Sequence, residues 1–288
     1  MMSIKIVIDS TADLTDEVLQ EYGIERVSLK VHFKEQTYRD WVDIQPKQFY
    51  HLLSEAKDLP TTSQPSPGEF IEIYKRLAET EQDITIISLH IGAKLSGTFQ
   101  SAILAKSMLP EIDINVIDTK QATCGIGLLA ITAAKAAKAG KTKEEILAII
   151  DNIIGNQRTL FMVDTLDYLH KGGRIGKASA LIGSLLNIKP ILSLDEEGGV
   201  MPVDKARGKK KAEKTILQIL KNNYGDVPLT VALCHANCLE TIEEFAQQMR
   251  SEFSISDIIY CDIGPVIGTH VGAGTWGVIV HETHFSEL

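Results

Sequence analysis

Hydroxyl side chains gather immediately before a predicted helix in the first quarter of the chain. Ser66 and Glu69 form a capping box around Pro67, which takes the favoured first helical position, so a helix begins there. Thr62 and Ser63 lie just upstream, on a segment that neighbouring prolines keep extended. Together these hydroxyls exceed what one helix cap requires. They form either an ordinary capped turn or a hydrogen-bonding site for an anionic or polar ligand head.

A second set of donors is expected where a buried strand runs into another helix. Residues 83–89 are a β-branched run typical of such a strand, and the following loop contains Ser96 and Gly97. Ser96 can cap the helix, and Gly97 lets another group approach the free backbone N–H groups of the helix start. Those groups favour a carboxylate or a phosphate. Two hydroxyl-bearing helix entries could therefore converge on one anionic ligand.

Three residues of the second half are candidates for ligand or partner contacts. Arg207 lies in a short basic run, which is either a solvated helix start or a source of a fork-shaped donor for a carboxylate. His270 lies in a glycine-rich stretch that we expect to be a tight loop, where it is either a packed histidine or a ligand donor. Arg174 follows two glycines in a turn, where it could meet a phosphate or a partner. Simple helix termination explains those glycines equally well.

The cysteines and the histidines near the end of the chain do not predict a metal site. Because the cysteines are scattered through a mid-sized chain, we expect reduced thiols rather than a disulfide framework: Cys124, Cys234, Cys238 and Cys261. The Cys234–Cys238 cluster lacks the second ligand pair of a structural zinc site. His281 and His284 miss the HExxH spacing, and we expect a solvated tail there.

A glycine pattern in the first half resembles a dinucleotide fingerprint only in outline. Gly125, Gly127 and Ala130 open a long alanine-rich helix as G-x-G-x-x-A. The pattern comes late in that half and lacks a clear ribose-binding acid about 20 residues further on. Close packing of the helix explains the glycines equally well. No cofactor is predicted.

Composition and charge limit the classes of function. The chain has 288 residues, 44% of them apolar, and a formal net charge of −9. This is enough for two domains with sizeable cores, and the acidic balance argues against a general nucleic-acid binder. The amino terminus enters a strand almost at once, without an apolar signal core or membrane span. We therefore expect a cytoplasmic protein.

The order of predicted elements indicates an α/β fold with two domains. Alternating strands and helices predict an N-terminal three-layer α/β/α domain with a parallel sheet over residues 1–155. A hairpin signal and further strands predict a C-terminal two-layer α/β domain with a mixed sheet over residues 156–288. Within these domains, alternation over residues 27–33 predicts one half-buried strand, and residues 178–186 predict a closely packed helix. Ligands are expected beyond the carboxyl ends of the parallel strands.

Six motifs in series resemble the DegV family of fatty-acid-binding proteins. They span nearly the whole chain: Asp9-Ser10-Thr11-Ala12-Asp13-Leu14, Thr62-Ser63-Gln64-Pro65, Leu95-Ser96-Gly97-Thr98, Gly172-Gly173-Arg174-Ile175, residues 205–211 and Gly268-Thr269-His270-Val271-Gly272. The resemblance implies two α/β domains with a long-chain fatty acid such as palmitate held between them. It also implies an acyl-carrying subunit of a bacterial fatty acid kinase.

The resemblance also assigns roles to individual residues. The fatty acid head group would be contacted by Thr62, Ser63, Ser96, Gly97, Arg207 and His270. Thr62 and Ser96 would be the principal hydroxyl contacts to the carboxylate. Arg207 and His270 would complete the site from the second domain. Arg174 is the candidate for contact with the kinase catalytic subunit.

Two function classes follow from these residues. The first is a non-catalytic carrier, for which burial of about 16 carbons contributes a gross gain on the order of 12 kcal/mol, at roughly 0.8 kcal/mol per CH₂. Such a carrier requires an apolar tunnel, and the sequence has no G-x-x-x-x-G-K-[ST] loop with which to bind ATP itself. The alternative is a serine acyl hydrolase or transferase with Ser96 as nucleophile and His270 as base. Ser96 lacks the G-x-S-x-G elbow of many such enzymes.

Overall fold

The first half of the protein is built on a four-stranded parallel sheet. The computed structural model describes residues 3–80, 83–183 and 189–285, and the strand order of this sheet is β2-β1-β6-β7. Its strands are β1 (Ser3–Asp9), β2 (Ile24–Val27), β6 (Ile84–His90) and β7 (Asp113–Asp118). All seven residues of β6 are buried, as expected for a β-branched strand covered on both faces.

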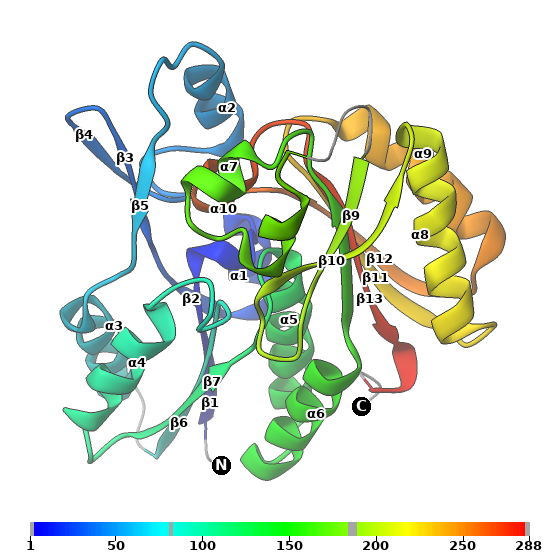
Figure 1. Ribbon diagram of the computed structural model, residues 1–288. Coiled ribbons are helices and arrows are strands. Elements are labelled where there is room, and N and C mark those ends of the chain that lie inside the picture. Colours follow the sequence, from blue (N-terminus) through cyan, green and yellow to red (C-terminus); the bar gives the residue numbers. More distant parts are fainter. Residues whose placement is uncertain (1–2, 81–82, 184–188, 286–288) are drawn as a thin grey trace.

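Helices cover both faces of this sheet and make three layers (Figure 1). One face packs against α1 (Asp16–Tyr22), α5 (Cys124–Lys138) and α6 (Lys143–Asn156). The other packs against α3 (Pro67–Thr80) and α4 (Thr98–Ser107). The capping box before α3 is confirmed, since the backbone N–H of Ser66 donates to Glu69 Oε2 at 2.8 Å and the backbone N–H of Glu69 donates to Ser66 Oγ at 3.4 Å.

A small antiparallel sheet lies beside the parallel one and carries the first hydroxyl cluster. Its strands, in the order β4-β3-β5, are β3 (Lys30–Phe33), β4 (Gln36–Arg39) and β5 (Thr61–Ser63), and α2 (Pro46–Ser54) adjoins them. The prediction of one strand over residues 27–33 was wrong. The chain leaves the parallel sheet after Val27 and starts a new strand at Lys30, because residues 28–29 turn it into a different sheet.

The second half contains a six-stranded mixed sheet in the order β10-β9-β8-β13-β11-β12. The strands are β8 (Arg158–Met162), β9 (Lys189–Leu194), β10 (Val200–Ala206), β11 (Leu229–His235), β12 (Ile255–Asp262) and β13 (Trp276–Glu282). One face packs against α8 (Lys209–Tyr224) and α9 (Leu239–Glu252). In Figure 1 these helices lie on the side away from α5. The opposite face contributes to a core shared with the first half. The predicted fold class, parallel α/β/α followed by mixed α/β, is confirmed.

Short helical segments occupy the region where the two halves meet. They are the 3₁₀ turns η1 (Ser10–Ala12) and η2 (Gly176–Leu181) and the helices α7 (Asp167–Lys171) and α10 (Pro265–Val271). The glycine-rich stretch around His270 is therefore a helix and not the loop we expected, because Pro265 takes the first helical position. The helix predicted over residues 178–186 is a 3₁₀ turn up to Leu181, and residues 184–186 lie outside the described residues.

Two expectations for cysteine and histidine were wrong. Cys124, at the start of α5, and Cys261, on β12, form a disulfide that joins the two halves. The sequence gives no local signal for this pair, because the two cysteines are 137 positions apart and only the fold brings them together. His281 is fully buried on β13 instead of lying in a solvated tail. In the described ranges no helix is long and apolar enough to cross a membrane.

The G-x-G-x-x-A pattern serves close packing. Gly125 and Gly127 are buried in α5, and a Cβ on Gly127 would lie 2.8 Å from Leu14 Cδ2 and 3.1 Å from the carbonyl oxygen of Ala12. Only a glycine lets α5 approach the turn after β1 this closely. The pattern is therefore accounted for without a dinucleotide.

Candidate functional site

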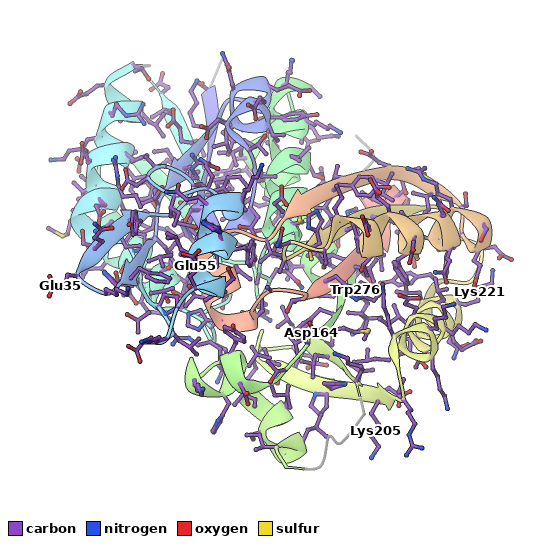
Figure 2. All side chains as sticks on the ribbon, turned by 90° about the horizontal axis from the view of Figure 1, so that it is seen from above. Glu35, Glu55, Asp164, Lys205, Lys221 and Trp276 are labelled. Atoms are coloured by element: carbon purple, nitrogen blue, oxygen red, sulfur yellow. A yellow bond between two sulfur atoms is a disulfide. The ribbon has the colours of Figure 1, made fainter. Side chains whose placement is uncertain are left out.

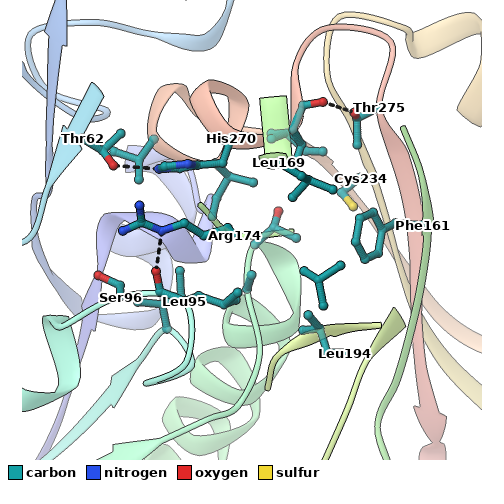
Figure 3. Close-up of a pocket in the computed structure, with 18 of the residues that line it drawn as sticks. Thr62, Leu95, Ser96, Phe161, Leu169, Arg174, Leu194, Cys234, His270 and Thr275 are labelled. Carbon is teal, nitrogen blue, oxygen red and sulfur yellow. Dashed lines mark hydrogen bonds between the residues drawn. The ribbon is translucent and has the colours of Figure 1, made fainter. Parts of the chain in front are cut away.

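A cavity of about 410 Å³ lies where the two halves meet. Both halves line it, with hydroxyl, imidazole and guanidinium groups in one part and mostly aliphatic or aromatic side chains in the rest (Figure 3). The apolar wall includes Leu95, Phe161, Leu169, Leu194, Val271 and Trp276. This volume falls within the range of about 300–1,000 Å³ that is usual for small-molecule sites. The cavity suits a ligand with one polar end and an apolar remainder.

The polar part of the cavity brings together residues that are far apart in the sequence. Thr62 comes from β5, Ser96 from the loop before α4, His270 from α10 and Arg174 from the turn after α7. Thr62 Oγ1 lies 2.8 Å from His270 Nε2, so a hydrogen bond crosses from the first half to the second. Ser63 also lines the cavity. Four of the six predicted head-group residues thus lie together: Thr62, Ser63, Ser96 and His270.

His270 is held as a neutral ring. Burial, and then the nearby Arg174 guanidinium, lower the pKa of His270 to about 4. Its Nδ1 is buried and has no hydrogen-bond partner within the described ranges, and a Cβ on Gly172 would collide with that atom. With its single proton on Nε2, the ring would donate to Thr62 Oγ1. The Thr62 hydroxyl proton would then be free to donate to an acid group in the cavity.

The pKa of His270 leads to a first prediction. In an NMR titration of the Cε1–H resonance, His270 is expected to change protonation near pH 4, and its pKa is expected to rise in Arg174→Met, which removes the cation. Because the folded-state pKa is below the usual 6.5, the stability that depends on the neutral ring is complete above pH 6.5 and falls towards pH 4. A titration midpoint near 6.5 in the unmodified protein would contradict this assignment.

The two arginines differ from expectation. Arg174 lines the cavity, where its Nε–H donates to the carbonyl oxygen of Leu95 at 3.1 Å and its Nη1–H donates to that of Gly172 at 2.7 Å. Arg207 is exposed between β10 and α8 and does not line the cavity. Its neighbour Lys205 lies at the outer edge of the molecule (Figure 2). The structure therefore does not bring Arg207 together with the other predicted head-group residues.

The Ser96 loop is supported by a glutamine that sequence reasoning missed. Gly97, not Ser96, takes the N-cap position of α4, and Ser96 Oγ accepts a 3.3 Å hydrogen bond from the backbone N–H of Thr98. The Gln64 side chain occupies the space beside Gly97, where a Cβ would collide with it. Gln64 also lines the cavity and donates through Nε2 to Ser101 Oγ at 3.0 Å. The Thr62-Ser63-Gln64-Pro65 motif was the only signal for it.

Two threonines and a cysteine in the wall away from Thr62 do not present strong polar groups to a ligand. Thr159 donates its hydroxyl proton to Gln121 Oε1 at 2.7 Å, and Thr275 donates to the carbonyl oxygen of Val271 at 2.9 Å. Burial raises the pKa of the Cys234 thiol to about 12, which keeps it protonated at neutral pH. A hydrocarbon chain could therefore pack there without leaving buried polar groups unpaired.

The geometry does not support a serine nucleophile. His270 bonds to Thr62, and Ser96 lies 2.9 Å from Thr98 Oγ1; no hydrogen bond joins Ser96 to His270 in the part of the chain that the structure describes. A histidine base must reach the hydroxyl that it activates. Across the same ranges no cluster of three or more ligating side chains could hold a metal ion.

The fold and this cavity define a structural class: a two-part α/β protein with a cavity between its halves that has polar groups in one part and is mostly apolar in the rest. Comparison with known proteins then gives the family. Residues 3–283 match the model of the DegV family, described as "Uncharacterised protein, DegV family". The chain belongs to the DegV family.

Relatives and solved structures agree with this assignment. The chain is 38% identical over 283 residues to a DegV domain-containing protein from Caldanaerobacter subterraneus, covering 98% of this chain and 100% of the relative. It is 35% identical to a fatty-acid-binding DegV family protein from Thermus thermophilus, with a TM-score of 0.92 and coverage of 98% and 100%. It is 29% identical to a stearic-acid-binding protein from Eubacterium ventriosum, with a TM-score of 0.89 and complete coverage of both chains.

Proposed function

We propose that this protein binds a long-chain fatty acid such as palmitate in the cavity between its two halves. The carboxylate would accept hydrogen bonds from Thr62, Ser96 and Arg174, with Ser63 and the Gly97 backbone nearby and His270 orienting Thr62. The tail would lie along the apolar wall. The observation that carries this proposal is one cavity with hydroxyls and a guanidinium at one part and hydrocarbon elsewhere. It is supported by relatives that bind fatty acids.

The energetics of a buried acid are consistent with this choice. A carboxylate taken out of water without partners is costly, whereas charge-assisted hydrogen bonds stabilise it. Arg174 uses Nε and Nη1 on the carbonyl oxygens of Leu95 and Gly172, which fixes the guanidinium plane beside the cavity. Nη2 would remain to donate to the ligand. We therefore propose Arg174 for the role that the resemblance gave to Arg207.

Solvent extraction of the purified protein, followed by mass spectrometry, tests the ligand class. We expect about one free fatty acid per chain. We also expect Thr62→Ala combined with Ser96→Ala to weaken palmitate binding at least about a hundredfold, because hydrogen bonds to a charged group contribute about 1.5–3 kcal/mol each.

The matched control is Thr61→Ala with Ser107→Ala. Thr61 lies on the same strand as Thr62, and Ser107 lies at the end of α4, the helix that follows the Ser96 loop. Both residues are exposed, and neither lines the cavity. The control should bind palmitate as the unmodified protein does. Release of a nucleotide, or equal binding by both double variants at unchanged melting temperature, would refute the proposed site.

We further propose that the chain is divided into two domains between residues 155 and 156. We also propose that the protein is not itself an enzyme but presents the bound acid to a separate fatty acid kinase subunit. This part rests on the family resemblance, as does a partner contact through Arg174. Acyl phosphate should form only when palmitate-loaded protein, ATP and the catalytic subunit are combined. Acyl phosphate formed without this chain would exclude the role.

A further inference from the structure

The turn at the end of β1 belongs to the family motifs but is not part of the proposed site. It comprises Asp9, Ser10, Thr11, Ala12 and Asp13, which we call the β1 turn, and every one of these side chains is at most 2% exposed. None of them lines the cavity. Three of its polar side chains accept hydrogen bonds from backbone N–H groups in other parts of the fold. Each of these hydrogen bonds ends on a different segment, and each segment positions one residue of the proposed site.

Asp9 holds the loop that carries Ser96. Its Oδ2 accepts a 2.9 Å hydrogen bond from the backbone N–H of Ile91 and lies 3.1 Å from His90 Nδ1. The ring of His90 is fixed in turn by Ser88 Oγ, 2.7 Å from its Nε2. Ile91 is the first residue after β6, so this bond sets where the loop towards Ser96 begins.

Ser10 holds the small sheet that carries Thr62. Its Oγ accepts a 3.0 Å hydrogen bond from the backbone N–H of Leu29, the residue immediately before β3. In that sheet Val31 of β3 is paired with Thr62 of β5. Since β5 pairs only with β3 among the described strands, the position of Thr62 depends on where β3 starts.

Asp13 holds the helix that carries His270. Its Oδ1 accepts 3.0 Å hydrogen bonds from the backbone N–H of Gly264, the N-cap of α10, and from Trp41 Nε1. A Cβ on Gly264 would collide with both Asp13 and the Trp41 ring, so the helix start approaches the carboxyl group as closely as glycine allows. This contact crosses from the first half of the chain to the second.

We propose that the β1 turn positions the ligand-binding residues, with Asp9, Ser10 and Asp13 setting the mutual placement of Ser96, Thr62 and His270. Each of these side chains acts through a backbone N–H at the start of a loop, strand or helix, where that N–H lacks a partner in its own element. The three acceptors lie within five consecutive buried residues packed on α5, so the three segments that they hold are fixed relative to one short stretch of chain. A binding site must be held to within about 0.5 Å to work, and the β1 turn supplies that support.

The test compares Asp13→Ala, Asp13→Asn and Glu213→Ala, and its affinity arm rests on the proposed function. Asp13→Ala removes the acceptor for Gly264, whereas Asp13→Asn keeps a side-chain carbonyl oxygen there. Glu213 is a buried acid of α8 outside the cavity and is the matched control. We expect Asp13→Ala to weaken palmitate binding at least about tenfold, and the other two variants to remain within about threefold of the unmodified protein.

Two readouts need no ligand. In Asp13→Ala we expect the amide of Gly264 to exchange with solvent faster, and the ring ¹⁵N shifts of His270 to change as its hydrogen bond to Thr62 is lost. Glu213→Ala should change neither. If the unmodified protein fails to bind palmitate, the proposed function falls, while these readouts still decide on the β1 turn.

If Asp13→Ala does not fold, Ser10→Ala provides a second test. Ser10→Ala removes the acceptor for Leu29 and also the hydrogen bond that Ser10 makes to Asp40. We expect it to accelerate exchange of the Leu29 amide and to weaken palmitate binding at least about fivefold. The positioning role is overturned if His270 shifts and palmitate affinity are unchanged in both Asp13→Ala and Ser10→Ala. It is equally overturned if Glu213→Ala, at the same loss of melting temperature, loses as much affinity as Asp13→Ala.

Discussion

Leu194→Asp is expected to lower the affinity for palmitate at least about a hundredfold, which corresponds to about 2.7 kcal/mol, while the protein still folds. Leu194 ends β9 and lies in the apolar wall of the cavity (Figure 3). A carboxylate there would have to give up its water when a hydrocarbon chain arrives, at an effective penalty of about 3 kcal/mol or more. Without ligand, water in the cavity can still solvate it.

Leu194→Met is the matched control, because it keeps the volume and the apolar character of the wall. Isothermal titration of delipidated protein with palmitate measures the affinities, and circular dichroism checks the fold. Leu194→Met should remain within about threefold of the unmodified protein. Binding of palmitate by Leu194→Asp with unchanged affinity would mean that the tail does not run past β9, and the proposed orientation of the ligand would be wrong.

Much of the first half could be predicted because its strands and caps are local signals. The β-branched run of β6 and the Ser66–Glu69 capping box each specify an element without help from distant residues. The split between β2 and β3 could not be predicted in this way. Alternation over residues 27–33 gives the period of a strand but not the sheet to which each part belongs. That choice is made by tertiary contacts such as the bond from Leu29 to Ser10.

The helix α10 shows how composition misled the prediction for the second half. Glycines around His270 indicated a loop, yet Gly268 lies inside the helix, where a Cβ would come within 2.7 Å of Tyr50 Oη and 2.8 Å of Phe49 Cε1. The glycine is there because α10 packs tightly on α2, not because the backbone needs a left-handed conformation. Pro265 at the first helical position is the local sequence signal for a helix here.

The hydroxyls and the histidine of the candidate site could be predicted from the sequence, but its arginine could not. Thr62, Ser96 and His270 line one cavity, as expected from family motifs and from groups that follow predicted strands. Arg207 had the stronger signal, a basic run in an acidic protein, and it faces solvent. Arg174 reaches the cavity because α7 packs against α10, with Gly172 against His270. No spacing in the sequence encodes that contact.

Asp40→Asn is expected to raise the free energy of unfolding by about 2 kcal/mol at pH 8 and to give no gain at pH 4. Burial raises the pKa of Asp40 from 3.8 to about 7, against hydrogen bonds from Ser10 and Val266 and the charge of Arg26, which lower it; Asp9 raises it further. A carboxyl that ionises near pH 7 in the folded protein and near 3.8 in the unfolded chain lowers the free energy of unfolding as pH rises. The loss is about 1.4 kcal/mol per pH unit between these two pKa values, or about 4 kcal/mol in all. The amide removes this loss but leaves a buried N–H₂ group, which costs about 1–3 kcal/mol.

The sign of the pH dependence is the decisive observation. Two opposite trends act on the stability of the unmodified protein between pH 4 and 7. Ionisation of Asp40 and of the adjacent Asp13, whose pKa burial also raises, lowers the stability as pH rises. Protonation of His270 lowers it as pH falls. Urea unfolding from pH 4 to 8 should therefore show stability rising more steeply with pH in Asp40→Asn. The control Asp43→Asn removes an exposed acid whose pKa is lowered by Arg39. This variant should therefore be less stable than the unmodified protein at pH 8, and the difference should shrink at pH 3. A pH profile of Asp40→Asn parallel to that of the unmodified protein would mean that Asp40 is ionised throughout and that a cation compensates it.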